Sequence, residues 1–247
     1  DSVWIFDGAR RALVFGPDRR FARTVPLPVS PWDAVVLDGG RIALTPAVFG
    51  QSLPWWLLDH DGTVIRRVGS SDSLVPSPRR IIAGQGRTVW TVAMTHRFRL
   101  DQWDLYGNHL QQFSTAPAWF VEHDEMRSPG LDQPPLAAEQ AAWVDTDGRI
   151  WIVGKVADPE WREGLGASVD GTAPIVNADR FYDTVVEVHD GKTGEVLSEG
   201  RFDGAYPFIA EPGVLMRVRT TAAGWHRAEL ARVLVDHGRI ASGEAAP

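Results

Sequence analysis

The sequence contains no cysteine, and among its 25 basic residues only Lys155 and Lys192 are lysines. The absence of cysteine excludes disulfides, a thiolate nucleophile, and zinc or iron–sulfur centres held by cysteine. No run approaches the roughly 20 apolar residues of a membrane-spanning helix, so we expect no membrane span. The net charge of −7 argues against a general nucleic-acid binder, so we expect no nucleic-acid partner.

The chain does contain enough apolar material for a sizeable core. It has 247 residues, 44% of them hydrophobic, and 11 of them are tryptophan, which argues against disorder. Helical periodicity is nearly absent, and residues 134–141 are the one stretch whose pattern fits a short helical turn. The pattern therefore predicts an all-β protein.

One recurring unit is Gly-Arg followed by an apolar run that often contains tryptophan. Its copies begin at Gly40, Gly86 and Gly148. The opening run, residues 2–6, fits the same slot without Gly-Arg. Trp4, Trp90 and Trp151 hold equivalent positions in these runs, so we expect them to fill the space between adjacent sheets rather than to bind a ligand.

A second unit is an apolar run that ends in an acidic turn and restarts as a strand, as in residues 55–65. Its anchor positions are 16, 59, 104, 190 and 236, which lie 43, 45, 86 and 46 residues apart. A period of about 45 residues with short strands is typical of a β-propeller blade. We interpret the interval of 86 as one blade with insertions, because it holds a single Gly-Arg-Ile-Trp unit.

These repeats predict a single-domain β-propeller of four-stranded antiparallel blades over residues 1–247. We expect about five blades, at residues 1–28 (partial), 32–70, 79–116, 118–204 (with insertions) and 205–243. The first lacks an upstream innermost strand, and residues 241–247 look like a polar tail. We therefore expect an N-terminally incomplete six-bladed ring with an unpaired strand edge in its first blade; the alternative is a five-bladed ring.

Particular runs carry a family resemblance. The strand 148–153 and the hairpin 58–69 resemble six-bladed propellers of the NHL/TolB-like superfamily. Residues 143–153, 158–161 and 183–188 resemble uncharacterised bacterial six-bladed β-propeller proteins. The resemblance implies export from the cytoplasm, to the periplasm or the outside of the cell, although no signal peptide is visible here. It implies nothing specific about function, since a fold hosts many functions.

The most informative segment for function follows Pro117, where we expect the first strand of the fourth blade and a channel mouth. The candidate binding residues are Trp119, Phe120, Glu122, His123, Asp124, Glu125 and Arg127. Aromatic walls beside titratable groups are the usual make-up of a binding cleft. The alternative is that Trp119 and Phe120 pack between blades while the acids are solvated.

The insertion 158–180 is the second candidate, because connections of this length are often functional. Trp161 and Arg162 would form a lid, since tryptophan and arginine are enriched at binding hot spots. The alternative is a mobile surface loop.

Histidine and aspartate recur in the hairpin turns, where a structural role is the simpler interpretation. His60, His189 and His237 lie in equivalent turns beside aspartates, which indicates turn residues on the outer rim. The runs 59–62 and 145–148 resemble the start of a calcium loop but lack its closing glutamate, so we expect no cofactor there, with calcium as the alternative.

The sequence favours a non-catalytic module that binds a small molecule or a protein outside the cytoplasm, because no catalytic constellation is visible. The first alternative is a metal-dependent hydrolase, lactonase or lyase, with residues 122–125 supplying ligands or a general base in the central channel. The second alternative is a structural scaffold domain.

Overall fold

The computed structural model describes residues 2–47, 55–69, 79–93, 97–122, 132–169, 173–211, 213–220, 223–236 and 239–244. The chain divides into two compact units, Asp1–Thr115 and Ala116–Pro247. The division falls between the third and fourth predicted blades, and each unit is a run of consecutive antiparallel sheets.

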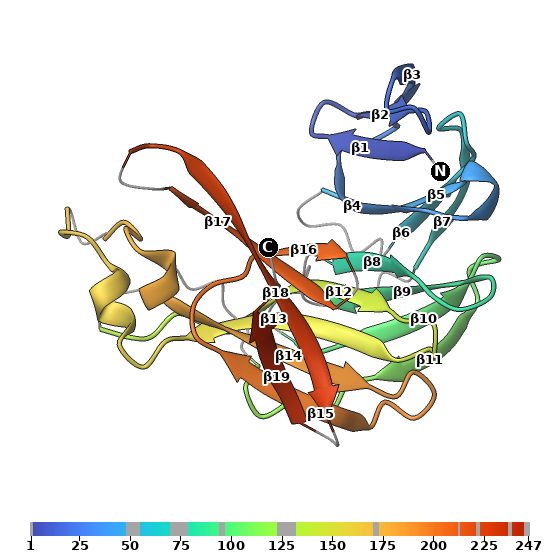
Figure 1. The fold of residues 1–247 in the computed structure, drawn as a ribbon. Coiled ribbons are helices and arrows are strands. Elements are labelled where there is room, and N and C mark those ends of the chain that lie inside the picture. The colour runs from blue at the N-terminus through green and yellow to red at the C-terminus, as the bar shows by residue number, and fades with distance from the viewer. Residues whose placement is uncertain are drawn as a thin grey trace. The chain divides into compact units, whose positions relative to one another are not determined.

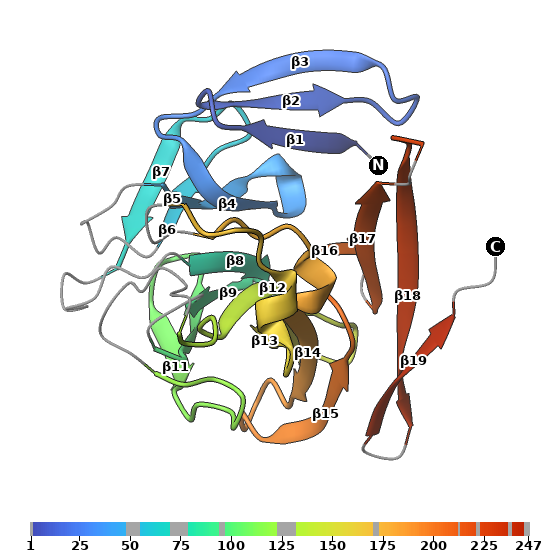
Figure 2. The ribbon, with the colours of Figure 1, turned by 90° about the vertical axis from the view of Figure 1, so that its left-hand side faces the viewer.

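The first unit holds three sheets, each built from strands that follow one another in the sequence (Figure 2). The first sheet has three strands, β1 (Val3–Asp7), β2 (Arg11–Phe15) and β3 (Phe21–Pro26). The second has four, β4 (Pro31–Val36), β5 (Ile42–Pro46), β6 (Trp55–Leu58) and β7 (Val64–Val68). The third also has four, β8 (Arg79–Ala83), β9 (Thr88–Ala93), β10 (Leu100–Asp104) and β11 (His109–Phe113).

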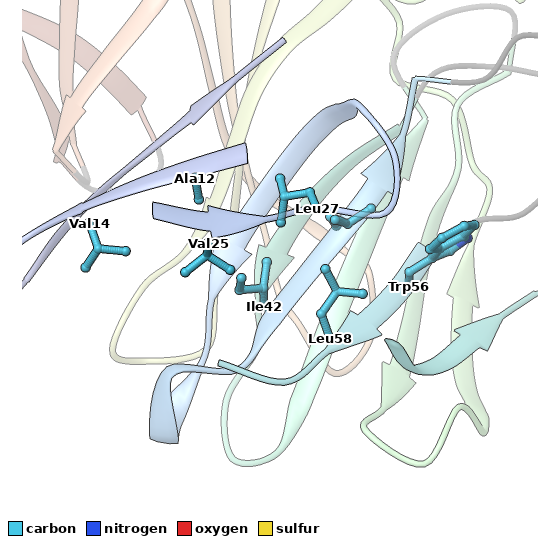
Figure 3. Packing of buried hydrophobic residues seen from close by; sticks show 8 residues of the cluster. Ala12, Val14, Val25, Leu27, Ile42, Trp56 and Leu58 are labelled. Atoms are coloured by element: carbon cyan, nitrogen blue, oxygen red, sulfur yellow. The ribbon is translucent and has the colours of Figure 1, made fainter. Parts of the chain in front are cut away.

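The first two sheets pack face to face through alternate side chains of their strands. Val14 and Val25 of the first sheet lie against Ile42 and Leu58 of the second, all at most 5% exposed (Figure 3). Successive strand residues point to opposite faces, so one strand serves two interfaces. Ala43 of β5, next to Ile42, therefore packs in the cluster shared with the third sheet.

Polar contacts add to the packing between the second and third sheets. The Thr45 hydroxyl donates to the Arg79 carbonyl at 2.8 Å, and the Ile81 amide donates to an Asp33 carboxylate oxygen at 3.0 Å. Burial raises the pKa of Asp33, and the hydrogen bond from Ile81 and the charge of Arg80 oppose that rise. Side chains of one sheet thus satisfy edge groups of the next.

The second unit holds two four-stranded runs, which a single parallel bridge between Glu199 and Arg239 joins into one eight-stranded sheet. The fourth sheet is β12 (Ala138–Val144), β13 (Ile150–Ala157), β14 (Tyr182–His189) and β15 (Val196–Phe202). The fifth is β16 (Phe208–Glu211), β17 (Val214–Thr220), β18 (His226–Asp236) and β19 (Arg239–Glu244). The long β17–β18 hairpin is prominent in Figure 1.

One apolar cluster joins the fourth and fifth sheets. It brings Val186 and Trp151 of the fourth sheet against Leu215 and Val233 of the fifth. Within the fourth sheet, Trp143 stacks on its cross-strand partner Trp151, with ring centroids 5.1 Å apart and an angle of 15° between the planes. Such offset stacking adds to the free energy of burial.

The repeat is visible in backbone detail. In four sheets the pairing register shifts near the end of the strand that precedes the acidic turn, which is β2, β6, β10 or β14. The shifts lie between Val14 and Phe15, Leu57 and Leu58, Gln102 and Trp103, and Val188 and His189. The acidic turn follows each shift. In the third sheet, for example, Asp104 accepts hydrogen bonds from the amides of Tyr106 and Asn108. Turn chemistry thus explains the recurring aspartates.

The predicted strands and turns are largely confirmed, with three corrections. Residues 134–141 were expected to form a helical turn, yet Ala138 begins β12, because pairing with β13 overrides a weak helical pattern. Residues 241–244, expected in a polar tail, belong to β19. The first strand of the fourth sheet is β12 and not the segment after Pro117, where the Phe120 amide closes a turn on the Pro117 carbonyl.

The core positions of the repeated tryptophans are confirmed for two of the three. Trp90 and Trp151 are 2% and 7% exposed. Trp4 is half-buried, because β1 lies at the edge of its sheet.

Candidate functional site

Trp119 and Phe120, the aromatic part of the predicted channel mouth, are packing residues in the second unit. Trp119 packs against Ala137, Val156 and Val185, and its ring covers Gly154 so closely that a Cβ atom there would lie 2.5 Å from it. Phe120 is 4% exposed and meets the Trp119 ring edge to face at 5.6 Å. Both rings thus make packing contacts, and a binding role for Trp119 stays a prediction.

The remaining residues of the predicted mouth are mostly outside the described part of the chain. Glu122 is described and exposed. His123, Asp124, Glu125 and Arg127 lie outside the described residues, as does His237. The role of this set as a site therefore stays a prediction.

The predicted lid lies in the connection between β13 and β14, whose described residues include two short 3₁₀ helices, η2 (Trp161–Gly164) and η3 (Ala178–Arg180). Trp161 is 5% exposed and packs edge to face on Phe181, with centroids 6.1 Å apart. Arg162 is exposed, and its guanidinium lies 4.5 Å from the Trp161 ring centroid. Trp161 thus anchors the insertion, and Arg162 is the member of the pair open to a partner.

Charged side chains tie the insertion to the fifth sheet. Asp179 of η3 contacts Arg219 at 2.7 Å and Arg217 at 3.4 Å. Arg217 also donates to Glu229 at 2.8 Å and lies over the Tyr206 ring. Burial alone would lower the pKa of Arg217, but the hydrogen bond to Glu229 and the nearby acidic groups raise it. We call Asp179, Arg217, Arg219 and Glu229 the insertion latch.

We expect Asp179→Asn to loosen the insertion without unfolding the unit. Because the latch is partly exposed, the loss should be about 1 kcal/mol, or roughly a fivefold rise in amide hydrogen exchange over the described parts of 160–181. Glu163→Gln, an exposed acid of the same insertion, is the control and should leave exchange unchanged. Equal exchange in the wild type and Asp179→Asn would show that the latch does not hold the insertion.

An acidic cluster lies at the base of the insertion and was not foreseen from the sequence. Ligand oxygens of Asp158, Asp183 and Asp203 all lie within 4.8 Å of one another, and Asp158 and Asp183 are buried. Oxygen ligands of this kind suit Ca²⁺ or Mg²⁺. However, Arg201 donates to Asp183 at 2.7 Å, so a guanidinium already neutralises part of this cluster.

Two more groups of titratable side chains gather around a buried acid, each within a single sheet. In the first unit, the fully buried Asp101 accepts hydrogen bonds from Arg79 and Arg99, both at 2.7 Å, and contacts His109 at 2.8 Å. In the second unit, His189 contacts Glu187 at 3.0 Å, and both are at most 2% exposed. The prediction that His189 lies in a rim turn is therefore wrong: it ends β14 inside the sheet.

The two runs that resemble the start of a calcium loop form hydrogen-bonded turns. Asp145 accepts hydrogen bonds from the amides of Asp147 and Arg149, from the Arg149 side chain at 2.7 Å and from the Trp151 indole at 2.8 Å. The Asp61 carboxylate accepts from the Thr63 amide. These contacts account for the aspartates as turn residues.

Lys155, one of the two lysines, is half-buried in β13. Its ammonium lies 4.6 Å from the centroid of the Tyr182 ring, and burial lowers the pKa of Lys155 and raises that of Tyr182. This is a cation–π pair on the face of β13 that also carries Trp151 and Val153, because alternate strand residues share a face.

Within the second unit, no described element fully covers one apolar face of the fifth sheet. Phe208, Met216 and Leu230 are directly opposite one another on β16, β17 and β18. Phe208, Val218, Leu230 and Leu234 are between 47% and 50% exposed. We call Phe208, Met216, Val218, Leu230 and Leu234 the β16–β18 outer face. Alternation between strand faces places the exposed Arg232 and His226 on the same side.

No family model matches the sequence, and no curated protein matches it. Solved structures do match. A quinohemoprotein alcohol dehydrogenase from Pseudomonas putida has a TM-score of 0.50 and 12% identity over 100% of this chain. BBS1N, solved in complex with ARL6DN, has a TM-score of 0.46 and 10% identity over 92% of this chain. BamB from Moraxella catarrhalis has a TM-score of 0.45 and 14% identity over 99%.

This chain spans 41% of the dehydrogenase chain, 55% of BBS1N and 73% of BamB. At these identities the likeness concerns the fold alone, and it agrees with the sheets described above: the protein is all-β and built from β-propeller blades. Among the described residues, no helix has the length and apolar character needed to cross a membrane.

Proposed function

We propose that this propeller is a non-catalytic module that binds a protein partner through the β16–β18 outer face. The observation that carries the proposal is the apolar row Phe208, Met216 and Leu230, which crosses three paired strands and whose end residues, Phe208 and Leu230, are about half exposed. Contiguous exposed apolar surface of this kind is typical of protein interfaces.

The kind of partner follows from the other face of the same strands. There Leu215 and Val233 are buried against the β-sheet formed by β12–β15. The outer face has the same alternation of side chains along its strands. We therefore expect the partner to present a flat apolar sheet surface that packs on it. Because Arg232 and His226 flank the apolar row, we expect carboxylates at the rim of the partner surface.

The test compares two equally exposed apolar residues of the second unit. Leu230 is 47% exposed on the outer face, and Val196 is 45% exposed on β15. Tagged wild type, Leu230→Glu and Val196→Glu are used to capture proteins from the producing cells, with recovery quantified by mass spectrometry. We expect Leu230→Glu to reduce the recovered partners at least tenfold and Val196→Glu to leave them unchanged. Equal recovery by all three proteins would refute the proposal.

The alternative function is a metal-dependent enzyme that would hold its metal at the acidic cluster. Asp158, Asp183 and Asp203 all come from the fourth sheet and its connections, whereas a channel metal would need ligands from several blades. Arg201 already pairs with Asp183. We therefore favour a structural role for the cluster.

Millimolar Ca²⁺, Mg²⁺ or Zn²⁺ should leave the unfolding temperature within about 1 °C of its value in EDTA. A metal held at 100 times its Kd would instead add about 2.7 kcal/mol and raise Tm by about 5 °C or more. Differential scanning calorimetry decides between these outcomes, with Asp203→Asn as the control. A rise that disappears in Asp203→Asn would restore the metal-dependent alternative.

Three finer expectations belong to the same proposal. The six-bladed ring rests on the repeat spacing and on the three-stranded first sheet, and the location outside the cytoplasm rests on the family resemblance. Glu122 and Arg162, the exposed described members of the predicted mouth and lid, form a second contact region. Fractionation of cells that produce the tagged protein tests the location.

A further inference from the structure

Lys155 of β13 is a half-buried basic residue that no described acid contacts. Its ammonium lies 4.6 Å from the centroid of the Tyr182 ring, and burial is the sole cause of its lowered pKa. The Lys155 nitrogen is not one of the described polar side-chain atoms that lack both a partner and contact with solvent, so a small reagent can reach it.

The register of the fourth sheet explains why no described acid faces Lys155. Lys155 pairs with Ala138 of β12 and with Thr184 of β14, and directly opposite residues are the nearest cross-strand neighbours. Neither neighbour carries a charge, and the Thr184 hydroxyl already donates to a backbone carbonyl. Two residues away along β13, on the same face, lie Val153 and Ala157. The ammonium therefore has an aromatic ring and uncharged side chains around it.

Two partly buried arginines show the usual arrangement, in which a carboxylate offsets the cost of burying a charge. Arg79 lies 2.7 Å from Asp101, and Arg217 lies 2.8 Å from Glu229. Lys155 has no such partner among the described residues, so its surroundings favour the neutral amine over the ammonium.

The residue type matters for chemistry at this position. Only Lys155 and Lys192 are lysines among the 25 basic residues. A guanidinium stays protonated in proteins, whereas a lysine amine can lose its proton and act as a nucleophile. Lys192 is exposed in the turn after Asp190, so the chain offers a comparison between two lysines in different surroundings.

We propose that Lys155 is a modification site, at which a small activated acyl donor such as an acyl phosphate acylates the side-chain amine. The free amine attacks the carbonyl carbon, the bond from that carbon to the phosphate oxygen breaks, and phosphate leaves with the bonding electrons. The amine proton passes to water. The product is a neutral amide, which removes the cost of a half-buried ammonium without an acidic partner.

The site lies where the insertion rejoins the fourth sheet, because β14 begins at Tyr182. The proposal rests on the surroundings of Lys155 within this sheet and does not depend on the β16–β18 outer face.

The probe is acetyl phosphate, added to the full chain at neutral pH. Mass spectrometry of proteolytic peptides follows acetylation of Lys155 and of Lys192 in the same sample. We expect Lys155 to react at least about threefold faster than Lys192 in the folded protein, because burial lowers its pKa and enlarges the unprotonated share of its amine. In guanidinium chloride, which unfolds the chain, the two rates should become similar.

A carboxylate placed beside Lys155 tests the role of the missing acid. Ala138→Glu puts it directly opposite Lys155, where it would pair with the ammonium and keep the amine protonated. Acetylation of Lys155 should then slow at least about threefold, while that of Lys192 stays unchanged. Ala138→Gln, which is similar in size and uncharged, is the control and should react like the wild type. Circular dichroism confirms that each variant is folded.

Three results would overturn the proposal. The first is acetylation of Lys155 no faster than that of Lys192 in the folded protein, and the second is the same ratio of rates in the folded and the unfolded chain. The third is equal slowing in Ala138→Glu and Ala138→Gln, which would show that access and not charge sets the rate. The first two comparisons use the wild type alone, so they decide even where Ala138→Glu does not fold.

Discussion

Replacing Trp119 by alanine should destabilise the second unit by about 3–5 kcal/mol, the usual cost of removing a large ring from a packed site. The ring fills the space over Gly154 and packs on Val156 and Val185, so its loss leaves a cavity against the fourth sheet. Urea unfolding followed by circular dichroism measures the change. Were Trp119 a ligand-binding residue on the surface, the same substitution would cost little stability.

The contact with Gly154 gives a sharper form of this test. In the wild type, Gly154→Ala forces a Cβ atom to within 2.5 Å of the indole, so we expect destabilisation. In the Trp119→Ala background the clash is absent and the methyl group occupies part of the cavity, so Gly154→Ala should be neutral or stabilising. Gly8→Ala, with no atom within 4 Å of its new Cβ, is the control. If the losses of unfolding free energy in Trp119→Ala and Gly154→Ala added up to the loss in the double variant, this account would be contradicted, since contacting residues are expected to couple.

Replacing Asp101 by alanine should destabilise the first unit by about 3–5 kcal/mol, because it leaves a buried charge without its partner. The guanidinium of Arg79 is 13% exposed and lies 2.7 Å from this fully buried carboxylate. Burial disfavours the charged form of Arg79 and lowers its pKa, an effect that Asp101 opposes. Asp18→Ala, which removes an exposed acid beside Arg20, should change stability by less than about 1 kcal/mol.

The effect of Asp101 should depend on pH in a defined direction. Burial opposes ionisation of the Asp101 carboxyl, but hydrogen bonds from Arg99 and Arg79 and the charge of Arg79 outweigh it and hold its pKa below the ordinary value. A lowered native pKa contributes stability above the unfolded-state pKa of 3.8 and loses it as pH falls through the native value. The difference in unfolding free energy between the wild type and Asp101→Asn should therefore become smaller as the pH falls. A difference that widens as pH falls would show that Asp101 is not held ionised in this way.

Much of the fold can be predicted from the sequence because its signals are local. An apolar run, an acidic turn and a second run specify a hairpin within about ten residues, and their spacing reveals the repeat. Trp90 and Trp151 are buried as their repeat position indicates. The helical pattern at 134–141 was misleading because pairing across to β13 decides the conformation of that segment.

The contacts of the candidate site could not be predicted, because they join residues that are distant in sequence and follow no repeat. Trp119 packs on Gly154, and no pattern in the sequence around either residue indicates this contact. Asp179 of the insertion meets Arg217 of the fifth sheet. In the first unit, the spacing of Arg99, directly before β10, and Asp101 within it was a usable signal for that ion pair, since residues two apart in extended backbone share a face.

The stacked pair of Trp143 and Trp151 gives the fourth sheet an optical signature of its own. Two indole chromophores 5.1 Å apart couple their electronic transitions, so this pair contributes a circular dichroism couplet that an isolated indole lacks. Fluorescence averages over 11 tryptophans, whereas a couplet from this pair reports on β12 and β13. Its amplitude would follow the opening of that strand pair through unfolding, separately from the rest of the molecule.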